Sequence, residues 1–248
     1  MFSNRRDRLY ATFVVVMDSL GFANRIRTAD ADALFKVWDQ IDRQYARFRA
    51  RIPNTFVFDM GRFGVFGTRE METLRLNDMF IAFSRRNTVE PDIRYLVSTS
   101  MLYHQMLLEG FIPRGGLGFG LVAGGDGLLI GDGFIDGYAR AEKRSAELKD
   151  ICAVEVSPKA MEAIRPTERR YRLICFYRGS LFIHPYALTD PDLGAFDRDR
   201  ILDCLRTAGA NDQKLTATAD FLDGFEDWEQ AQAAGSASRT YYGPVPER

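Results

Sequence analysis

The stretch T-F-V-V-V-M-D-S-L-G-F, residues 12–22, decides the fold of this chain. Its first six residues are apolar or β-branched without a break, which is typical of a strand buried in the middle of a sheet. Asp18 ends that strand. An unpaired carboxylate buried there is costly, so Asp18 either holds a cation at the rim of the core or caps the next helix.

The spacing of apolar residues after this strand predicts the remaining helices and strands. We expect helices over 31–50, 91–109, 134–149 and 158–164, strands over 55–66, 76–84, 112–122 and 151–156, a glycine-rich loop over 123–133, and a strand or hairpin over 171–183. The order βαββαβ followed by αββ predicts an α+β fold. Its ferredoxin-like core would have two helices on one face of a four-stranded antiparallel sheet, with a polar C-terminal extension over 189–248 that ends in a loose tail.

Composition narrows the classes of partner. The chain has 248 residues, 46% of them hydrophobic, and a formal net charge of −1. This balance gives no global attraction to nucleic acid or to an anionic membrane, so we expect neither as a partner. Three widely spaced cysteines and the lack of a membrane-spanning apolar run indicate a reducing, cytoplasmic location.

A second aspartate strengthens the case for a cation site. Asp78 follows Asn77 at the start of another apolar strand. In a βαββαβ sheet the first and third strands are neighbours, so Asp18 and Asp78 can face each other across about 5 Å. Two carboxylates so close repel each other unless cations lie between them. The alternative is that Asp78 belongs only to a hairpin turn.

Two glycine-containing segments complete the pattern. In the first, 113–120, alternate glycines leave one face of a strand bare, so that another backbone or a flat ligand can approach. Arg114 within it either contacts phosphates or pairs with an acidic neighbour. In the second, 131–142, a glycine turn opens a helix on which Asp136 and Arg140 share a face, either as a surface ion pair or as part of a site.

Taken in order, these segments resemble the class III nucleotidyl cyclases over about residues 12–183. Asp18 to Phe22 is similar to that family's first metal-binding turn, and Asn77-Asp78 to its second. Residues 114–120 resemble its R-x-G-I-x-x-G strand. Residues 131–140 resemble its G-x-x-V-N-x-A-x-R helix. The resemblance therefore implies that residues 1–188 form a nucleotidyl cyclase catalytic domain.

The resemblance also implies the roles of the site residues. Asp18, Ser19 and Asp78 would bind two Mg²⁺ or Mn²⁺ ions, and Asp18 and Asp78 would thereby be catalytic. The turn formed by Ser19, Leu20, Gly21 and Phe22, together with Arg114, would bind the substrate phosphates. Arg140 would offset charge that develops on the α-phosphoryl group. The family implies a homodimer in which Arg140 acts on the neighbouring subunit's site.

Departures from the family pattern concern the base. Purine cyclases have an asparagine where this chain has Asp136, and their purine-reading lysine has no clear counterpart here. Residues 114–116 and 133–138 are more similar to the stand-alone bacterial pyrimidine cyclases of Pycsar anti-phage defence. We therefore expect conversion of UTP, or CTP, to a 3′,5′-cyclic nucleotide and pyrophosphate, with the product (cUMP for UTP) acting as a second messenger on a separate effector. The alternatives are an adenylate or guanylate cyclase, a catalytically inactive cyclase-like nucleotide-binding or interaction module, and a ferredoxin-like module without a nucleotide.

Overall fold

A computed structural model of the chain describes most of its central part. The described residues are 9–22, 27, 30–33, 35–36, 39, 42–43, 46, 71–76, 79–84, 91–125, 128–164, 173–186, 189–190 and 194–227. Asp78, Asn77, the predicted strand over 55–66 and the predicted tail over 231–248 lie outside them. No helix in the described part is long and apolar enough to cross a bilayer.

The described elements alternate between strands and helices. The strands are β1 (Leu9–Ser19), β2 (Met71–Leu76), β3 (Met79–Ser84), β4 (Pro113–Gly125), β5 (Leu128–Gly131), β6 (Val154–Val156), β7 (Ile174–Tyr177), β8 (Ser180–Ile183), β9 (Thr189–Asp190), β10 (Gly194–Ala195) and β11 (Glu226–Asp227). The helices are α3 (Pro91–Leu108), α4 (Asp132–Glu142), α5 (Pro158–Ala163), α7 (Arg198–Thr207) and α8 (Asp212–Gly224). All described residues from 31 to 46 are helical as well, in agreement with the helix predicted there.

The sheet confirms the predicted α+β class and ferredoxin-like core. Its order is β11-β7-β8-β6-β4-β1-β3-β2, with β5 paired to β4. Within it, β4-β1-β3-β2 is antiparallel throughout, which is the strand order of a split βαββαβ unit. β1 is central and its residues 12–17 are buried, as their unbroken apolar run predicts.

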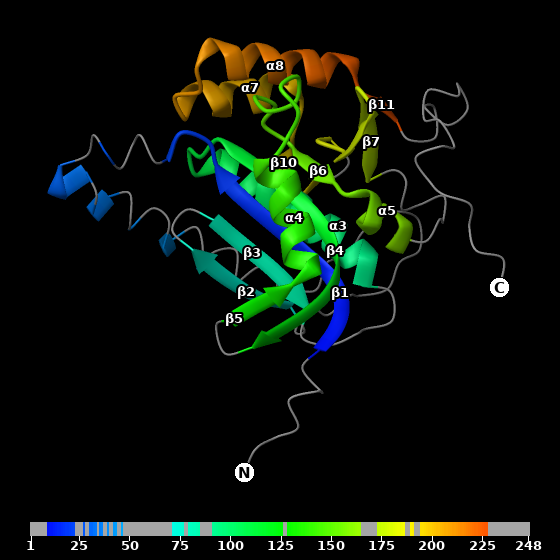
Figure 1. Ribbon diagram of the computed structural model, residues 1–248. Coiled ribbons are helices and arrows are strands. Elements are labelled where there is room, and N and C mark those ends of the chain that lie inside the picture. The colour runs from blue at the N-terminus through cyan, green and yellow to red at the C-terminus, as the bar shows by residue number, and fades with distance from the viewer. Residues whose placement is uncertain are drawn as a thin grey trace.

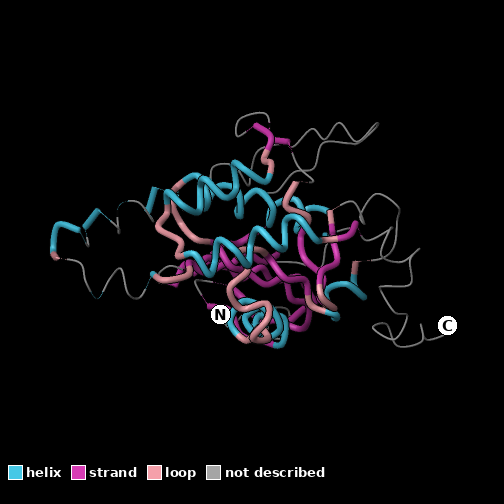
Figure 2. The backbone as a smooth tube through the Cα atoms, turned by 90° about the horizontal axis from the view of Figure 1, so that it is seen from above, coloured by secondary structure: helices cyan, strands magenta, loops and turns pink. Residues whose placement is uncertain are grey.

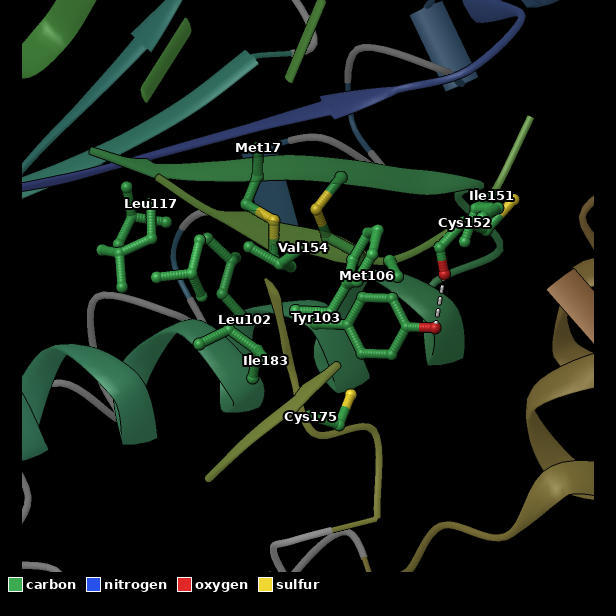
Figure 3. Packing of buried hydrophobic residues seen from close by; sticks show 14 of the residues in the cluster. Met17, Leu102, Tyr103, Met106, Leu117, Ile151, Cys152, Val154, Cys175 and Ile183 are labelled. Atoms are coloured by element: carbon green, nitrogen blue, oxygen red, sulfur yellow. Dashed lines mark hydrogen bonds between the residues drawn. The ribbon is translucent and has the colours of Figure 1, made fainter. Parts of the chain in front are cut away.

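The larger part of the core lies between the sheet and α3. Met17 and Leu117 from the sheet lie beside Leu102 and Met106 from α3 (Figure 3). The Tyr103 hydroxyl donates a hydrogen bond of 2.8 Å to the carbonyl of Cys152, which ties α3 to the segment before β6 (Figure 3). Gly110, with φ of 75°, follows the end of α3 and turns the chain towards β4.

The opposite face of the sheet is covered by α4. Figure 1 shows α4 in front of β4 and β1 with α3 behind them, and Figure 2 shows helices on both sides of the strands. Val14 and Val16 of β1 point to this second face and pack in a smaller cluster that includes Ala141 and, partly buried, Phe134 and Tyr138 of α4. Side chains of β1 thus alternate between two cores.

Several predicted boundaries were wrong. The strand beside β3 is β2, most of which lies between the strands predicted over 55–66 and 76–84, where the sequence predicts no element. It is an edge strand, and its two charged residues, Glu72 and Arg75, are three positions apart in sequence, so apolar and polar residues do not alternate along it. The predicted loop over 123–133 instead contains the end of β4 and the short strand β5. Here a run of only three apolar residues, 128–130, is hidden among glycines.

Two further boundaries differ from the prediction. The predicted helix over 134–149 is α4, which ends at Glu142. The Nε of Arg144 donates to the carbonyl of Arg140 at 2.9 Å, so that carbonyl bonds a side chain at the point where a continuing helix would supply the amide of residue 144. The strand predicted over 151–156 is limited to β6, which lies parallel to β4 over three residue pairs.

Two helices in the C-terminal part were not predicted. α7 and α8 pack on the α3 side of the molecule through Ile201, Leu205 and Phe221, all of them buried. Each begins at a capping side chain, Asp197 for α7 and Asn211 for α8. Their few apolar residues lie among many charged ones, which masks the helical spacing in the sequence.

Candidate functional site

Asp18 lies where the sequence predicts, at the end of the central strand. The antiparallel register pairs Met17 with Phe80, so β3 begins at Met79 next to Asp18. Asp78 directly precedes Met79 in the chain but lies outside the described residues. The structure thus brings the start of β3 to Asp18 and leaves the predicted facing of the two carboxylates untested.

Arg114 lies opposite Asp18 on the neighbouring strand. Its guanidinium is 2.7 Å from Glu142 at the end of α4 and 3.5 Å from Asp18, and the side chains of Arg114 and Asp18 are only 12% and 17% exposed. Of the two roles considered for Arg114, pairing with acidic neighbours is therefore the one present. The longer distance to Asp18 shows that Glu142 is the main partner of this guanidinium.

The turn after Asp18 is shaped by Gly21, which has φ of 83°. The amide of Leu20 donates to the carbonyl of Ile112 at 2.8 Å, so it is already committed within the chain. Any phosphate contact through backbone amides of this turn falls mainly to Gly21 and Phe22. Ser19 is buried and points to the α3 side, whereas Asp18 contacts Arg114, the partner of Glu142 at the end of α4.

The glycine-rich strand receives a helix rather than a flat ligand. Gly116, Gly118 and Gly120 of β4 face α4, in which Gly133 and Gly137 are also glycines. A Cβ on Gly118 would lie 2.6 Å from the carbonyl oxygen of Gly133 and 2.8 Å from the Cα of Gly137. Backbone therefore packs on backbone here, which answers the question that the alternate glycines raised.

Asp136 is turned inward and is not paired with Arg140. Its Oδ2 accepts hydrogen bonds from the amide of Phe119, at 3.1 Å, and from the hydroxyl of Ser157. β4 pairs with β6 only up to Leu117, so the carboxylate takes the place of a strand partner for Phe119. Ser157 in turn caps α5 by accepting from the amide of Ala160.

Arg140 lies on the side of α4 that packs on the sheet, next to Gly116 of β4. Its Nη1 is 3.3 Å from Oε1 of Glu155, which also accepts a hydrogen bond from the hydroxyl of Ser180 at 3.3 Å. The Arg140 side chain is 39% exposed, while that of Glu155 is only 5% exposed. Arg140 is thus oriented by a buried carboxylate and still reaches solvent.

Arg144 is a buried cation that we did not anticipate. Its guanidinium donates to the carbonyls of Gly115, Ile151 and Ala153, and it lies 3.5 Å from Glu155. Burial lowers the pKa of Arg144 to about 10, and the negative charge of Glu155 partly offsets this effect by raising the pKa.

Glu155, unlike Arg144, had a signal in the sequence. It lies between Val154 and Val156 in the apolar strand β6. The argument that singled out Asp18, a carboxylate in an apolar run, applies equally to Glu155. Nothing in the local pattern distinguishes Arg144 from a solvent-exposed arginine at the end of a helix.

Of the two aspartates predicted to bind metal, the structure describes Asp18 but not Asp78. The described residues contain no group of three or more histidine, cysteine or acidic side chains able to hold a metal ion. Among the described residues, Asp18 fits such a role, because its carboxylate is a hard oxygen donor at the rim of the core and Arg114 is held more closely by Glu142. A complete site would need at least one further carboxylate, for which Asp78 is the candidate.

Comparisons with known proteins find similarity in backbone structure but none in sequence families. No protein-family model and no curated protein sequence match the chain. Among solved structures, it is similar to the guanylyl cyclase Cya2, with a TM-score of 0.49 and 9% identity over 75% of this chain and 97% of that one. It is also similar to the adenylyl cyclase CyaB from P. aeruginosa, with a TM-score of 0.48 and 13% identity over 71% of this chain and 93% of that one.

Proposed function

We propose that this protein is a nucleotidyl cyclase, which converts a nucleoside triphosphate to a 3′,5′-cyclic nucleotide and pyrophosphate. The observation that carries the proposal is the position of Asp18. Its carboxylate ends the central strand beside the start of β3, directly before a glycine turn. The sequence places Asp78 next to that start, and the motifs that resemble class III cyclases follow in the same order.

The chemistry requires a divalent metal, which the carboxylates of Asp18 and Asp78 would hold. The Ser19 side chain points to the other face of the sheet, so Ser19 would take part only through its backbone carbonyl. When bound, two Mg²⁺ or Mn²⁺ ions would lower the pKa of the ribose 3′-hydroxyl and neutralise negative charge on the triphosphate. Asp18 contributes negative charge at a place where Arg114 and Glu142 fix the end of α4.

The remaining contacts concern the phosphates. The amides of Gly21 and Phe22 would bind phosphate oxygens at the turn. Arg140 would offset the charge on the α-phosphoryl oxygens, and Glu155 holds it in position while leaving it partly exposed.

The catalytic unit would be a homodimer. The sequence resemblance places the aspartates and the arginine of one site on different subunits, so two equivalent composite sites would form about a two-fold axis. The catalytic domain would span residues 1–188, and the cyclic product would be read by a separate effector protein.

A pyrimidine is the favoured base. The chain has no clear counterpart of the purine-reading lysine, and a pocket built for a smaller ring excludes purines by shape and by unpaired polar groups. We therefore favour UTP first and CTP second, and with them a role in anti-phage defence.

The direct test is incubation with UTP, CTP, ATP and GTP separately in the presence of Mn²⁺, followed by mass analysis of the products. A cyclic pyrimidine nucleotide formed by the wild type and lost in Asp18→Ala, with unchanged thermal stability, is the expected result. Faster turnover of ATP or GTP would make the protein a purine cyclase. Nucleotide-dependent stabilisation without any product would leave an inactive nucleotide-binding module, and no response at all would leave a module without a nucleotide.

A further inference from the structure

The end of α4 brings a second carboxylate close to Asp18. Close packing of α4 on the glycines of β4 sets the course of this helix across the sheet. Its last residue, Glu142, therefore reaches Arg114, which lies 28 residues earlier in the chain. Arg114 in turn is the cross-strand neighbour of Asp18. Glu142 and Asp18 thus approach the same guanidinium from two different elements.

The two carboxylates compete for one nitrogen atom. The Nη2 of Arg114 is 2.7 Å from Oε1 of Glu142 and 3.5 Å from Oδ2 of Asp18. The shorter distance is typical of a charge-assisted hydrogen bond, and the longer one is not. The Nε of the same guanidinium is buried and has no hydrogen-bond partner among the described residues. Since no bond to Nε fixes the guanidinium there, its position depends on which carboxylate holds Nη2.

A divalent cation at Asp18 has to compete with Arg114 for the same carboxylate. The side chains of Arg114 and Asp18 are 12% and 17% exposed, so water and salt screen their attraction only weakly. If Arg114 closed on Asp18, a cation would have to break a charge-assisted hydrogen bond before it could bind. Glu142 opposes that closure, because it holds the guanidinium at the shorter distance. Two carboxylates also outweigh one guanidinium, so negative charge remains at this end of β1.

We infer that Glu142 is a positioning residue for the metal site, which keeps the Asp18 carboxylate available to a divalent cation by holding Arg114. The inference rests on the proposed function, because the cation is the one that the cyclase reaction needs. Glu142 acts through Arg114 and is not itself a ligand, since its Oε1 is engaged by the guanidinium. The end of α4 then serves the metal through Glu142 and the phosphoryl charge through Arg140.

The test measures Mn²⁺ binding to the full chain by isothermal titration calorimetry, without nucleotide. A double-mutant cycle compares the wild type, Glu142→Gln, Arg114→Met and the variant with both substitutions. Asp18→Asn identifies the binding that belongs to this site. Glu147→Gln is the matched control, because it removes the same charge from an exposed glutamate five residues further along the chain. Urea unfolding of each variant checks that it is folded under the conditions of the titration.

We expect Glu142→Gln to weaken Mn²⁺ binding about 10-fold or more when Arg114 is present, because the released guanidinium then bonds Asp18. Arg114→Met should bind Mn²⁺ more tightly than the wild type, a gain that a folding defect cannot produce. In the Arg114→Met background, Glu142→Gln should weaken binding only about 3-fold, since only the loss of a nearby negative charge remains. Glu147→Gln should bind Mn²⁺ as the wild type does.

Three results would overturn the inference. Glu142→Gln could weaken binding equally with and without Arg114, which would make Glu142 a direct ligand or merely a source of charge. Arg114→Met could bind Mn²⁺ no more tightly than the wild type. The wild type could show no Mn²⁺ binding that depends on Asp18 at millimolar concentration.

Formation of a cyclic nucleotide from UTP, followed in parallel, separates this inference from the proposed function. An active cyclase that gives any of the three results keeps the proposed function and loses the role of Glu142. Coupling between Glu142 and Arg114 in a chain that forms no cyclic nucleotide would instead keep the positioning role and remove the cyclase.

Discussion

Replacing Gly118 by alanine tests the contact between α4 and the sheet, on which the position of Arg140 depends. The new Cβ would lie 2.6 Å from the carbonyl oxygen of Gly133 and 2.8 Å from the Cα of Gly137, and closer still to the amide nitrogen of Gly137. All three atoms are backbone, so no change of rotamer relieves the overlap. The helix would have to move away by roughly 1 Å to restore ordinary contact distances.

The direction of the effect is informative because two opposite terms compete. Overpacking of an interior position costs about 1–3 kcal/mol. Removing a glycine from a strand, taken alone, would instead stabilise the protein by about 0.5–1 kcal/mol. We therefore expect the free energy of unfolding of Gly118→Ala to fall by about 1–2 kcal/mol, and its Tm to fall by about 2–4 °C for each kcal/mol.

The measurement is equilibrium unfolding in urea, compared with Gly115→Ala as the control. Gly115 lies in the same strand but faces the thioether of Met17, a flexible side chain that can yield. Its substitution should cost less than that of Gly118. A Gly118→Ala protein as stable as the wild type, or more stable, would show that α4 does not approach the strand as described.

Three other outcomes are expected. Mixing Asp18→Ala with Arg140→Ala subunits should restore about a quarter of the wild-type activity when exchange is random and equimolar, because one composite site per mixed dimer is intact; no recovery after verified exchange would place Arg140 in its own subunit's site. Asp136→Ala should lose about 1–3 kcal/mol of unfolding free energy, because the amide of Phe119 and the hydroxyl of Ser157 lose their acceptor. Asp136→Asn keeps an oxygen acceptor and should lose less in the same urea titration. Burial raises the pKa of Cys152 to about 11 from 9.0, so the thiol ionises at a lower pH in the unfolded chain than in the folded one. The wild type should therefore lose unfolding free energy as pH rises from 9 to 11, by up to about 1.4 kcal/mol per pH unit. Cys152→Ala should lose less over that interval, and an equal loss would contradict the burial of this thiol.

The central sheet was predictable because its signals are local and strong. The unbroken apolar run before Asp18 predicts a buried strand, and α3 begins at Pro91 with a glycine, Gly110, just beyond its end. Edge elements gave weaker signals. β2 contains Glu72 and Arg75 three positions apart in sequence, which breaks the alternation expected of a strand, and α7 and α8 bury only a narrow apolar stripe, so their patterns resemble those of loops.

The candidate site was predictable in part, for a different reason. Asp18 carries a local signal, a carboxylate at the end of an apolar strand. The partners of Arg114 and Asp136 depend instead on how α4 packs on β4, which no single segment determines. Likewise, Asn211 and Lys214 at the start of α8 line one cleft with the turn after β1, although nearly the whole chain separates them in sequence. Local sequence patterns contain no information about contacts between segments so far apart in the chain.

Arg144 has a consequence for the order of folding events. Its guanidinium bonds carbonyls from the start of β4, the end of α4 and the segment before β6. An arginine gains little by leaving water until these acceptors are in place, so we expect its bonds to form late, after the transition state in which the sheet first assembles. Interactions that are absent from the transition state govern the unfolding rate. Substitution of Arg144 should therefore speed unfolding and leave the folding rate nearly unchanged, which makes this side chain a determinant of how long the native protein persists.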